Sequence, residues 1–267
     1  MVVALVTGAS RGLGRAISIQ LADDGMDVAV NDIPGALPAL ESLKEEIEKK
    51  GRRAITVVAD VSNEQQVQDM IKQTVDNLGE LNVMVANAGI MVPKKLFDLS
   101  LAEWERVQAV NATGAFLCYR EAGRQMVAQG QGGKIIGACS IAGYRPSGNA
   151  LAYSASKWTV RGLTQAVALD LAQYNINVNA YCPGPVDTAM WEEIDESIAQ
   201  RDGLAKGVAF EKSIQSRSAL KRASTPEDIA NLVSFLASPR ARNITGQSMI
   251  CDGGKLSLPK TYPGIPY

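Results

Sequence analysis

Tyr153 and Lys157, a phenol and an amine, stand four positions apart in this 267-residue sequence. The segment after them carries apolar residues at helical spacing, at Val160, Leu163 and Val167. On a helix, positions i and i+4 lie one above the other, so the phenol and the ammonium group would be neighbours. A nearby positive charge favours phenolate and lowers a phenol pKa that is ordinarily about 10. The spacing therefore predicts that Tyr153 gives and takes a proton near neutral pH.

Ser140 ends an apolar, β-prone run, KIIGACS (134–140), so its hydroxyl would project from the carboxyl end of a strand. There it would hydrogen-bond a substrate oxygen that Tyr153 protonates. A Tyr-x-x-x-Lys pair alone is weak evidence, because most such pairs lie on solvated helix faces. The residues around the pair decide between the two interpretations.

The sequence has no histidine and four scattered cysteines, Cys118, Cys139, Cys182 and Cys251. The absence of histidine excludes Ser-His-Asp hydrolysis, Cys-His proteolysis and His-ligated zinc. The cysteines show no CxxC spacing, so we expect buried, reduced thiols rather than a disulfide framework or a metal site. Acid-base chemistry therefore falls to Tyr, Lys, Asp or Glu.

Composition is ordinary for a soluble enzyme, with 46% hydrophobic residues and a formal net charge of −1. There is no basic stripe, which argues against nucleic acid and anionic membrane as partners. No segment approaches 18 uninterrupted apolar residues, and the apolar opening MVVALVTG lacks the basic region of a signal peptide. We therefore expect a cytoplasmic protein.

The chain opens with an apolar β-type run (1–7), a glycine-rich turn and an amphipathic helix marked by Ala16, Ile17 and Leu21. In this context the glycines let the backbone approach a pyrophosphate that sits on the helix N-terminus. The spacing is Gly-x-x-x-Gly-x-Gly, which also fits a plain connection between strand and helix. The residues predicted to bind a dinucleotide in this turn are Gly8, Ser10, Arg11, Gly12, Leu13 and Gly14.

Asp32 ends the second predicted strand (27–32), about twenty residues beyond the glycine turn. A carboxylate there would bond the 2′-OH of the adenosine ribose and repel a 2′-phosphate, which favours NAD over NADP. Arg11 favours NADP, because a cation in the glycine turn can meet that phosphate. An apolar Ile33 follows Asp32, where an arginine would strengthen the NADP case. We expect NAD, with NADP as the alternative, and a loop-capping role is the structural alternative for Asp32.

Strands at 53–58, 81–86, 134–140, 176–181 and 247–251 alternate with helical patterns along the rest of the chain. This alternation indicates an α/β protein with a parallel sheet covered on both faces. No linker or shift in composition divides the sequence, so we expect one domain over 1–267. A capping-box pattern, Ser62-x-x-Gln65, predicts the start of the helix after the third strand.

Several polar and small residues follow the predicted strands and extend the list of candidates. Asp60 and Val61 close the third strand, where Asp60 either caps the turn or bonds the adenine. Small residues at Asn87, Ala88 and Gly89 would let the backbone lie against a cofactor where the strand order reverses. The predicted strand at 176–181 leads into a rigid turn that would hold a nicotinamide carboxamide, through Pro183, Gly184, Val186 and Thr188.

Asn111 lies inside a long helical stretch, roughly 101–129. Asparagine is a poor mid-helix residue unless its amide has partners. A local kink with a bound water is one interpretation, and an exposed side chain is the other. Further on, the mixed amphipathic pattern at 189–216 predicts a lid over the substrate, and the Pro-containing tail (255–267) is expected to lie extended on the surface.

With these residues in place, the chain resembles a short-chain dehydrogenase/reductase along essentially its full length. The matching marks are TGASRGLG (7–14), Asp60-Val61, NAG (87–89), Asn111, Ser140, YSASK (153–157) and PGPVDT (183–188). The resemblance implies a single-domain Rossmann fold with a doubly wound, seven-stranded parallel sheet, hydride transfer at a carbinol or carbonyl carbon, and no metal. It also implies a homotetramer built partly on the helices that hold Asn111 and Tyr153.

Carried onto this sequence, the resemblance assigns four catalytic residues. Tyr153 would be the acid-base, and Ser140 would position the substrate oxygen. Lys157 would bind the cofactor ribose and depress the pKa of Tyr153, while Asn111 would hold a water that links Lys157 to solvent. In reduction, Tyr153 would protonate the ketone oxygen as the nicotinamide delivers hydride.

Within the family, the runs at 138–143, 181–195 and 245–254 are similar to acetoin (diacetyl) reductases and butanediol dehydrogenases. We therefore expect a small diketone or hydroxyketone such as diacetyl or acetoin as substrate. The candidate substrate contacts are Ser140, Ala142, Tyr144, Tyr153, Gly184 and Trp191. Arg11 and the tail depart from this nearer pattern, which leaves an NADPH-dependent reductase of a bulkier secondary-metabolite ketone as the alternative.

A second class of function is a non-catalytic, dinucleotide-binding regulator on the same fold, since fold does not fix function. The intact set of Asn111, Ser140, Tyr153 and Lys157 argues against it, because a regulator has no need for all four.

Overall fold

The computed structural model describes residues 2–257, except for the side chains at 193, 197, 200–202, 212, 213, 216 and 217. Its centre is a seven-stranded parallel sheet in the order β3-β2-β1-β4-β5-β6-β7. The strands are β1 (Val3–Thr7), β2 (Asp27–Asp32), β3 (Ala54–Val58), β4 (Val83–Ala86), β5 (Gly133–Ala138), β6 (Ile176–Pro183) and β7 (Ser248–Cys251). The doubly wound Rossmann sheet predicted from the sequence is confirmed.

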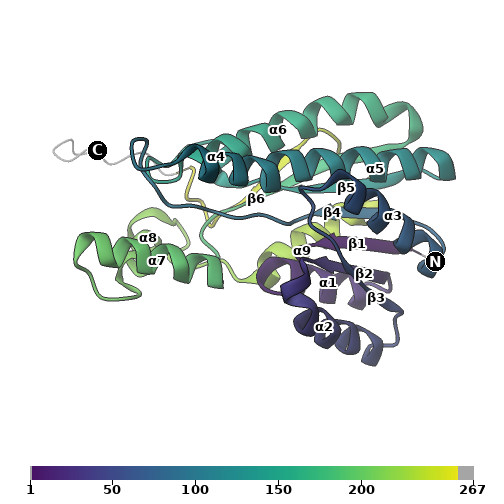
Figure 1. Cartoon of the computed structure of the whole chain (residues 1–267), viewed down its shortest axis with the longest axis horizontal. Coiled ribbons are helices and arrows are strands. Elements are labelled where there is room, and N and C mark those ends of the chain that lie inside the picture. The colour runs from purple at the N-terminus through teal and green to yellow at the C-terminus, as the bar shows by residue number, and fades with distance from the viewer. Residues whose placement is uncertain (1, 258–267) are drawn as a thin grey trace.

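Helices cover both faces of this sheet (Figure 1). The helices are α1 (Gly12–Asp23), α2 (Leu37–Lys49), α3 (Glu64–Leu78), α4 (Leu101–Gln108), α5 (Gly114–Gln129), α6 (Leu151–Leu171), α7 (Ala189–Asp202), α8 (Val208–Arg217) and α9 (Pro226–Ala237). Helices α1, α2 and α9 pack on one face through residues such as Ile17, Leu40 and Val233. Helices α3, α5 and α6 pack on the other through residues such as Met70, Leu117 and Ala168. Both faces of the strands are therefore buried, as their near-continuous apolar sequences require.

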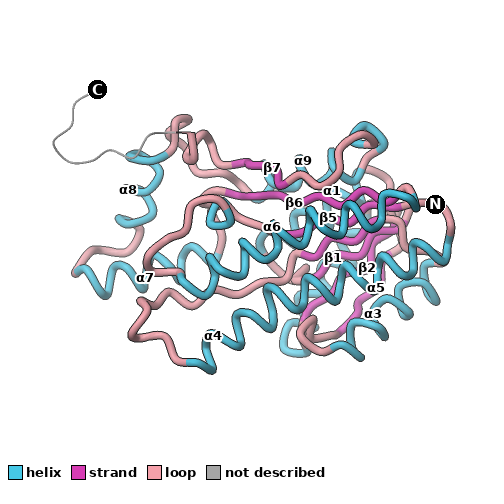
Figure 2. Tube along the Cα trace, turned by 90° about the horizontal axis from the view of Figure 1, so that it is seen from above, coloured by secondary structure: helices cyan, strands magenta, loops and turns pink. Residues whose placement is uncertain are grey.

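The order of the strands reverses between β1 and β4, which are neighbours in the sheet but far apart in the sequence. After β1 the chain crosses to one face of the sheet, and after β4 it crosses to the other. The loops that follow these two strands diverge and leave a crevice at the carboxyl edge, which is where ligands bind in open α/β sheets. Helices α7 and α8 extend beyond this edge, in both views of the chain (Figures 1 and 2).

Most predicted elements lie within a few residues of their observed bounds, and one cap is wrong. Helix α3 begins at Glu64, and its N-cap is Asn63, whose side chain accepts a hydrogen bond from the backbone of Gln66. Ser62 instead donates to Asp60, at 2.6 Å, so it is not free to form the predicted box with Gln65. Helix α9 begins with a capping box formed by Thr225 and Asp228.

The structure tests only part of the predictions for the C-terminal tail, for membrane helices and for the cysteines. Residues 255–257 form a turn, and the rest of the tail expected to lie extended is outside the described residues. Within 2–257, no helix combines the length and the apolar composition that crossing a bilayer requires. The four cysteines are free thiols, of which Cys118, Cys139 and Cys182 are buried.

Candidate active site

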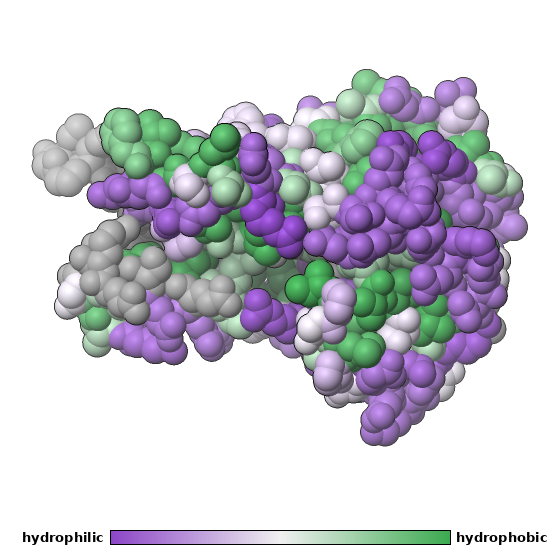
Figure 3. Space-filling model, in the orientation of Figure 1, coloured by the Kyte–Doolittle hydropathy of each residue, from purple (hydrophilic) through white to green (hydrophobic). Residues whose placement is uncertain are grey.

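A cavity of about 1090 Å³ lies at the carboxyl edge of the sheet, between the strand ends and the helices α7 and α8. Figure 3 shows it as a hollow with apolar residues on its walls. Its lining draws on the segment after every strand from β1 to β7, which explains why candidates scattered along the sequence meet here. Of the predicted cofactor residues, those on this lining are Gly8, Arg11, Gly12, Leu13, Gly14, Asp32, Asp60, Val61, Asn87, Ala88, Gly89, Tyr153, Lys157, Pro183, Gly184, Val186 and Thr188.

The glycine turn is packed too tightly for side chains at two of its positions. Gly8 has φ +63°, and a Cβ there would lie 2.9 Å from the Cα of Ala88. A Cβ on Gly14 would lie 2.1 Å from the carbonyl oxygen of Gly8. Gly12, with φ +54°, opens α1, and a Cβ there would meet only Thr188, at 3.7 Å. The turn thus presents bare backbone and a helix N-terminus to the cavity, a cradle that fits the pyrophosphate of a dinucleotide.

The Asp32 side chain is hydrogen-bonded to this turn. Its Oδ2 accepts hydrogen bonds from the Ser10 hydroxyl at 2.6 Å and from the Ser10 backbone at 3.2 Å. Its Oδ1 accepts from the backbone of Ile33 at 2.9 Å. The carboxylate is half-buried on the cavity wall, whereas Ser10 lies behind it and does not line the cavity. Asp32 therefore caps the loop, which is one of the two roles that the sequence left open, and it also lies on the cavity wall, as the other role requires.

Asp60 lines the same end of the cavity and is also held by its neighbours. Its Oδ1 accepts from the hydroxyl and the backbone of Ser62, and Arg106 lies 3.4 Å from its Oδ2. Burial raises the pKa of Asp60, but these hydrogen bonds and the Arg106 charge outweigh it, so the pKa is lowered. A carboxylate so paired stays ionised, and the structure supports the capping interpretation of Asp60 directly.

The NAG segment at 87–89 is bound to β1 through the side chain of Thr7. The Thr7 hydroxyl accepts from the backbone of Asn87 at 3.0 Å and of Ala88 at 3.1 Å. The Asn87 amide donates to the carbonyl oxygen of Thr7 at 2.8 Å. These bonds fix the segment at the switch point, beside the glycine turn.

Asn111 interrupts its helix. Between α4 and α5 the chain forms a π-helical turn, Ala109–Thr113, and Asn111 in that turn is 1% exposed. Its amide exchanges two hydrogen bonds with the backbone of Ile90, at 2.8 and 2.9 Å, and donates a third to Ser156. The interpretation as a kink is therefore confirmed, and the alternative of an exposed side chain is wrong. The water that it was expected to hold stays a prediction.

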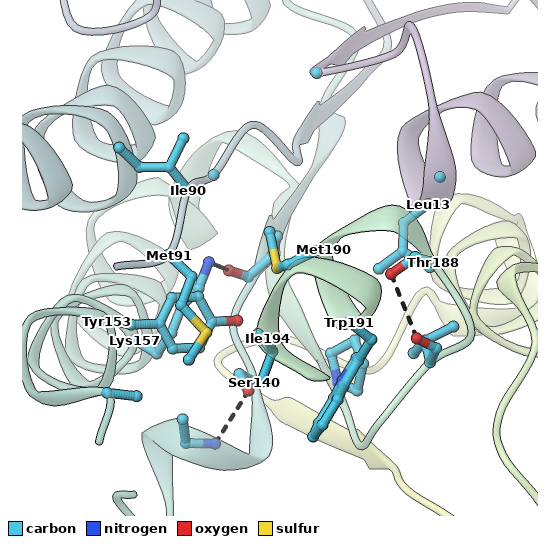
Figure 4. Close-up of a pocket in the computed structure, with 18 of the residues that line it drawn as sticks. Leu13, Ile90, Met91, Ser140, Tyr153, Lys157, Thr188, Met190, Trp191 and Ile194 are labelled. Atoms are coloured by element: carbon cyan, nitrogen blue, oxygen red, sulfur yellow. Dashed lines mark hydrogen bonds between the residues drawn. The ribbon is translucent and has the colours of Figure 1, made fainter. Parts of the chain in front are cut away.

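Tyr153, Lys157 and Ser140 come together on the cavity floor (Figure 4). The first two lie in the first two turns of α6, and the Lys157 Nζ is 5.2 Å from the centre of the Tyr153 ring. Lys157 is 3% exposed and donates to the carbonyl oxygen of Ala138, at the end of β5, at 2.7 Å. Ser140 follows the same strand, and its hydroxyl accepts from the backbone of Ala142 at 3.1 Å. The three side chains that the sequence analysis grouped together therefore lie on one part of the cavity lining.

The predicted shift in the pKa of Tyr153 is wrong in this structure. Burial raises the pKa of Tyr153 to about 12, although a hydrogen bond with Ser140 acts in the opposite direction. Burial also lowers the pKa of Lys157 to about 8. The positive charge of Lys157 would lower the pKa of the phenol, but both groups are also removed from water. For both of them the loss of water is the larger effect. Tyr153 is therefore held as a neutral phenol, a proton donor.

The turn after β6 and helix α7 form the opposite wall. Thr188 precedes α7, and its hydroxyl donates to the carbonyl oxygen of Val186 at 3.3 Å (Figure 4). Trp191 faces the cavity, and its ring packs against Phe210 of α8 with centroids 5.4 Å apart. The apolar side chains on this part of the lining are Ile90, Met91, Met190, Trp191, Ile194, Ile198 and Leu204. The predicted lid region thus supplies one apolar wall and the segment after β4 supplies another.

Tyr144 does not lie where the sequence placed it. Its hydroxyl donates to the carbonyl oxygen of Ser248 in β7 at 2.5 Å. Its ring packs beneath the guanidinium of Arg161, at 3.8 Å, and does not line the cavity. The other predicted substrate contacts, Ala142, Gly184 and Trp191, do line it. The short 3-10 turn at Ile141–Gly143 lies between Ser140 and Tyr144, and after it the Tyr144 side chain points toward β7.

Three residues that sequence reasoning missed belong to the site or to its support. Arg145 lines the cavity and donates to the carbonyl oxygen of Leu256, at 2.7 Å, which brings the end of the described chain to the substrate side. Ser156 bonds both Asn111 and the Tyr153 carbonyl oxygen. Tyr181 lines the cavity from β6. None of these carries a spacing signal, although Ser156 lies inside the YSASK motif and Tyr181 opens the run at 181–195.

Comparison with known proteins adds an independent line of evidence. The model of a family described as enoyl-(acyl carrier protein) reductase matches residues 8–255. A short-chain dehydrogenase/reductase of Armillaria gallica is 48% identical over 252 residues, which cover 94% of this chain and 95% of that protein. A diacetyl reductase [(S)-acetoin forming] of Staphylococcus epidermidis is 40% identical, and the match covers 94% and 97% of the two chains.

A solved structure gives the same result. The acetoin dehydrogenase of Salmonella typhimurium superposes with a TM-score of 0.85 at 32% identity, over 98% of each chain. The similarity to diacetyl and acetoin enzymes that the sequence motifs predicted is therefore confirmed.

Proposed function

The chain belongs to the short-chain dehydrogenase/reductase family, and from this premise we propose that it reduces a ketone to a secondary alcohol at the floor of the cavity. The chain is an oxidoreductase that uses a nicotinamide cofactor and acts on CH–OH groups or the matching carbonyls. The observation that carries the proposal is the meeting of Ser140, Tyr153 and Lys157 beside the glycine turn in one cavity.

Each residue of the constellation has one task in the proposed reaction. The Ser140 hydroxyl and the Tyr153 phenol both hydrogen-bond the carbonyl oxygen of the substrate, which polarises the carbonyl. When bound, a reduced nicotinamide cofactor supplies hydride to the carbonyl carbon. Tyr153 donates its proton to the oxygen, and the raised pKa of this phenol keeps that proton available at neutral pH. Lys157 contributes a positive charge next to the phenol, which stabilises the phenolate as it forms.

Asn111 supports this set, and the cofactor residues line the rest of the cavity. We assign Gly8, Gly12, Leu13 and Gly14 to the pyrophosphate, and the NAG segment, Val186 and Thr188 to the nicotinamide half. We assign residues 189–216 as the lid over the substrate. The continuity of the cavity from Asp32 to Tyr153 supports these assignments, because a dinucleotide needs one uninterrupted groove.

NAD is the proposed cofactor. The support is the Asp32 carboxylate, which Ser10 and the Ile33 backbone hold on the wall of the adenosine end. A negative charge fixed there repels a ribose 2′-phosphate. Arg11 also lines this end, so NADP is the alternative, and the ratio of rates with NADH and NADPH decides between them.

A small diketone or hydroxyketone, such as diacetyl or acetoin, is the proposed substrate. The relatives and the solved structure that carry those names support it. The site offers the two polar groups that a small carbonyl compound needs, Ser140 and Tyr153, beside apolar side chains of the cavity wall.

A bulkier ketone is the second candidate, and the chamber itself favours it. Apolar side chains face the floor from the lid and from the segment after β4, among them Met91, Met190, Trp191 and Ile194 (Figure 4). Apolar contact area increases binding in proportion to the surface removed from water. A ring system offers more apolar surface to these side chains than a four-carbon diketone does.

The test is an initial-rate comparison of diacetyl, acetoin and a series of cyclic ketones, each with NADH and NADPH. Fast NADH-linked reduction of diacetyl supports the first substrate, and rates that rise with ring size support the second. The Tyr153→Phe variant is the control, because it keeps the ring and removes the proton. It should bind cofactor normally and lose turnover, and full activity in this variant would contradict the mechanism and leave a dinucleotide-binding regulator.

We also propose a homotetramer, which acts in the cytoplasm. Apolar side chains stand exposed on the outer sides of α4, α5 and α6, namely Leu101, Phe116, Trp158 and Leu169. Exposed apolar patches of this kind mark contact surfaces. Light scattering should give the mass of four chains, and Leu169→Glu, at a residue that is 81% exposed, should reduce that mass.

The free cysteines support the proposed location in the cytoplasm, which fractionation of cells tests.

A further inference from the structure

A buried phenol on β6 reaches across β5 to the end of β4. The Tyr181 hydroxyl lies 2.7 Å from the Oδ1 of Asn87, the first residue of the NAG segment. Strands β4 and β6 are separated by β5 in the sheet, so the Tyr181 side chain spans the width of one strand. Tyr181 is 0% exposed and is among the largest fully buried side chains of the described chain. Burial raises the pKa of Tyr181 well above its usual range, so the hydroxyl keeps its proton and donates it.

The Asn87 side chain carries this contact to the glycine turn. Its Nδ2 donates to the carbonyl oxygens of Thr7, at 2.8 Å, and Gly8, at 3.1 Å. The same nitrogen lies against the start of α1, because a Cβ built on Gly14 would be only 2.7 Å from it. The position and orientation of one amide therefore set the backbone of the turn that faces the cavity.

An asparagine amide has two ends of nearly equal shape, and only one orientation fits here. The two carbonyl oxygens of the turn need the NH2 end, so the Oδ1 must point the other way and needs a donor. The Tyr181 hydroxyl is that donor. Phenylalanine at this position would keep the ring but leave the Oδ1 without this bond, so the amide would be held from its NH2 end alone.

We propose that Tyr181 is a positioning residue for cofactor binding, which acts through the orientation of Asn87 on the glycine turn. The inference rests on the proposed assignment of that turn to the cofactor. It predicts that the Tyr181 hydroxyl affects the affinity for the dinucleotide and leaves proton transfer at Tyr153 unchanged once the cofactor is saturating.

The sharpest test compares Tyr181→Phe with Tyr119→Phe. Tyr119 is also 0% exposed, and its hydroxyl makes a similar buried bond, at 3.0 Å, to the Thr164 hydroxyl between α5 and α6. Each variant removes one buried phenol hydroxyl, but only the first touches Asn87. The dissociation constants of NADH and NADPH are measured by fluorescence titration, together with the thermal unfolding midpoint and kcat at saturating cofactor.

The expected result is a rise of about tenfold in the cofactor dissociation constant for Tyr181→Phe, which is what the loss of one well-formed hydrogen bond produces. Tyr119→Phe should leave the constant unchanged, although both variants lower the unfolding midpoint. An unchanged constant in Tyr181→Phe, or an equal rise in both variants, would overturn the inference.

A second comparison tests the route through Asn87. In the Asn87→Ala background the Tyr181 hydroxyl has lost its acceptor, so Tyr181→Phe should cause no further rise in the dissociation constant. A further rise of the same size would show that Tyr181 acts by another path and would overturn the inference. Failure of the wild-type enzyme to bind either cofactor would instead overturn the proposed function on which the inference rests.

Discussion

The amide nitrogen of Asn111 lies 3.0 Å from the hydroxyl oxygen of Ser156 and donates a hydrogen bond to it. The same hydroxyl donates to the carbonyl oxygen of Tyr153 at 2.7 Å. One buried serine therefore joins the π-helical turn between α4 and α5 to the first turn of α6, which carries the proposed acid-base. The interrupted helix and the helix of the reacting phenol are held as one unit.

Ser156→Ala should loosen this unit. The variant leaves the Asn111 amide without one acceptor in a buried place, so the free energy of unfolding should fall by about 1–3 kcal/mol. The Tyr153 phenol loses its fixed position, so kcat should fall more than the cofactor affinity. Urea unfolding and steady-state rates measure the two effects. Thr159→Ala, which removes an exposed hydroxyl bonded to Ala155 in the same helix, is the matched control. Equal behaviour of the two variants would contradict this account.

The two directions of the reaction should depend on pH in different ways. The pKa of Tyr153 is raised to about 12 in the free enzyme, so the phenol is neutral at pH 7 and ready to donate in ketone reduction. Alcohol oxidation needs the phenolate, whose fraction grows about tenfold per pH unit below that value. The oxidation kcat/KM should therefore rise between pH 6 and 8, while the reduction kcat/KM stays level. Parallel profiles for the two directions would rule out Tyr153 as the shared acid-base.

Lys157 should make stability depend on pH at alkaline values. Its pKa is lowered by burial to about 8 from an ordinary 10.5. Below pH 8 both the folded and the unfolded states carry the proton, and the folded state bears the full cost of burying the charge, on the order of 3 kcal/mol. Between pH 8 and 10.5 the unfolded state binds more protons, so the free energy of unfolding should rise with pH.

Lys157→Met removes this dependence and serves as the reference for it. From pH 8 to 10, urea unfolding should show the wild type gaining stability relative to Lys157→Met, and turnover of the variant should be lost. Lys72→Met, at a lysine whose side chain is 72% exposed, is the control and should follow the wild type. A constant difference between wild type and Lys157→Met across this range would show that the buried ammonium keeps its ordinary pKa.

Asp32→Asn should shift the cofactor preference toward NADPH. The amide keeps one oxygen that accepts from Ser10 but loses the acceptor for the Ile33 backbone, and it removes the negative charge that repels a 2′-phosphate. The ratio of kcat/KM with NADPH to that with NADH should rise about tenfold, which corresponds to about 1.4 kcal/mol. Asp24→Asn, at an exposed acid on the far end of α1, should leave the ratio unchanged. An unchanged ratio in Asp32→Asn would indicate that Arg11, rather than Asp32, determines the cofactor preference.

Trp191→Ala should distinguish small from large substrates. Its ring faces the chamber and packs on Phe210, so removing it opens the lid wall. The loss of a large apolar contact should raise the KM of a cyclic ketone about tenfold or more, while diacetyl, which touches less of the wall, changes little. The two substrates are measured on the same protein, so each is the control for the other. An equal loss for both would indicate that Trp191 shapes the whole site rather than its outer wall.

Local sequence signals were sufficient for the parts of the site that lie within one element or one turn. Three features can each be recognised within one short segment, because they depend on the local backbone alone. They are the glycine turn, the Tyr153–Lys157 spacing and the end of β5 at Ser140. Asn111 was identified for the same reason, since an asparagine in a helix interior demands an explanation, and the π-helical turn supplies it.

The parallel sheet, the class of chemistry and the residues proposed to perform it follow from the amino-acid sequence, because strand periodicity, turn glycines and helical spacing are properties of neighbours in the chain. The tertiary structure alone turns Tyr144 away to β7 and brings Tyr181 across β5 to Asn87. It also decided that burial raises the pKa of Tyr153 above its ordinary value. These outcomes depend on distances between segments far apart in sequence and on how much water reaches each group, and no local pattern encodes either.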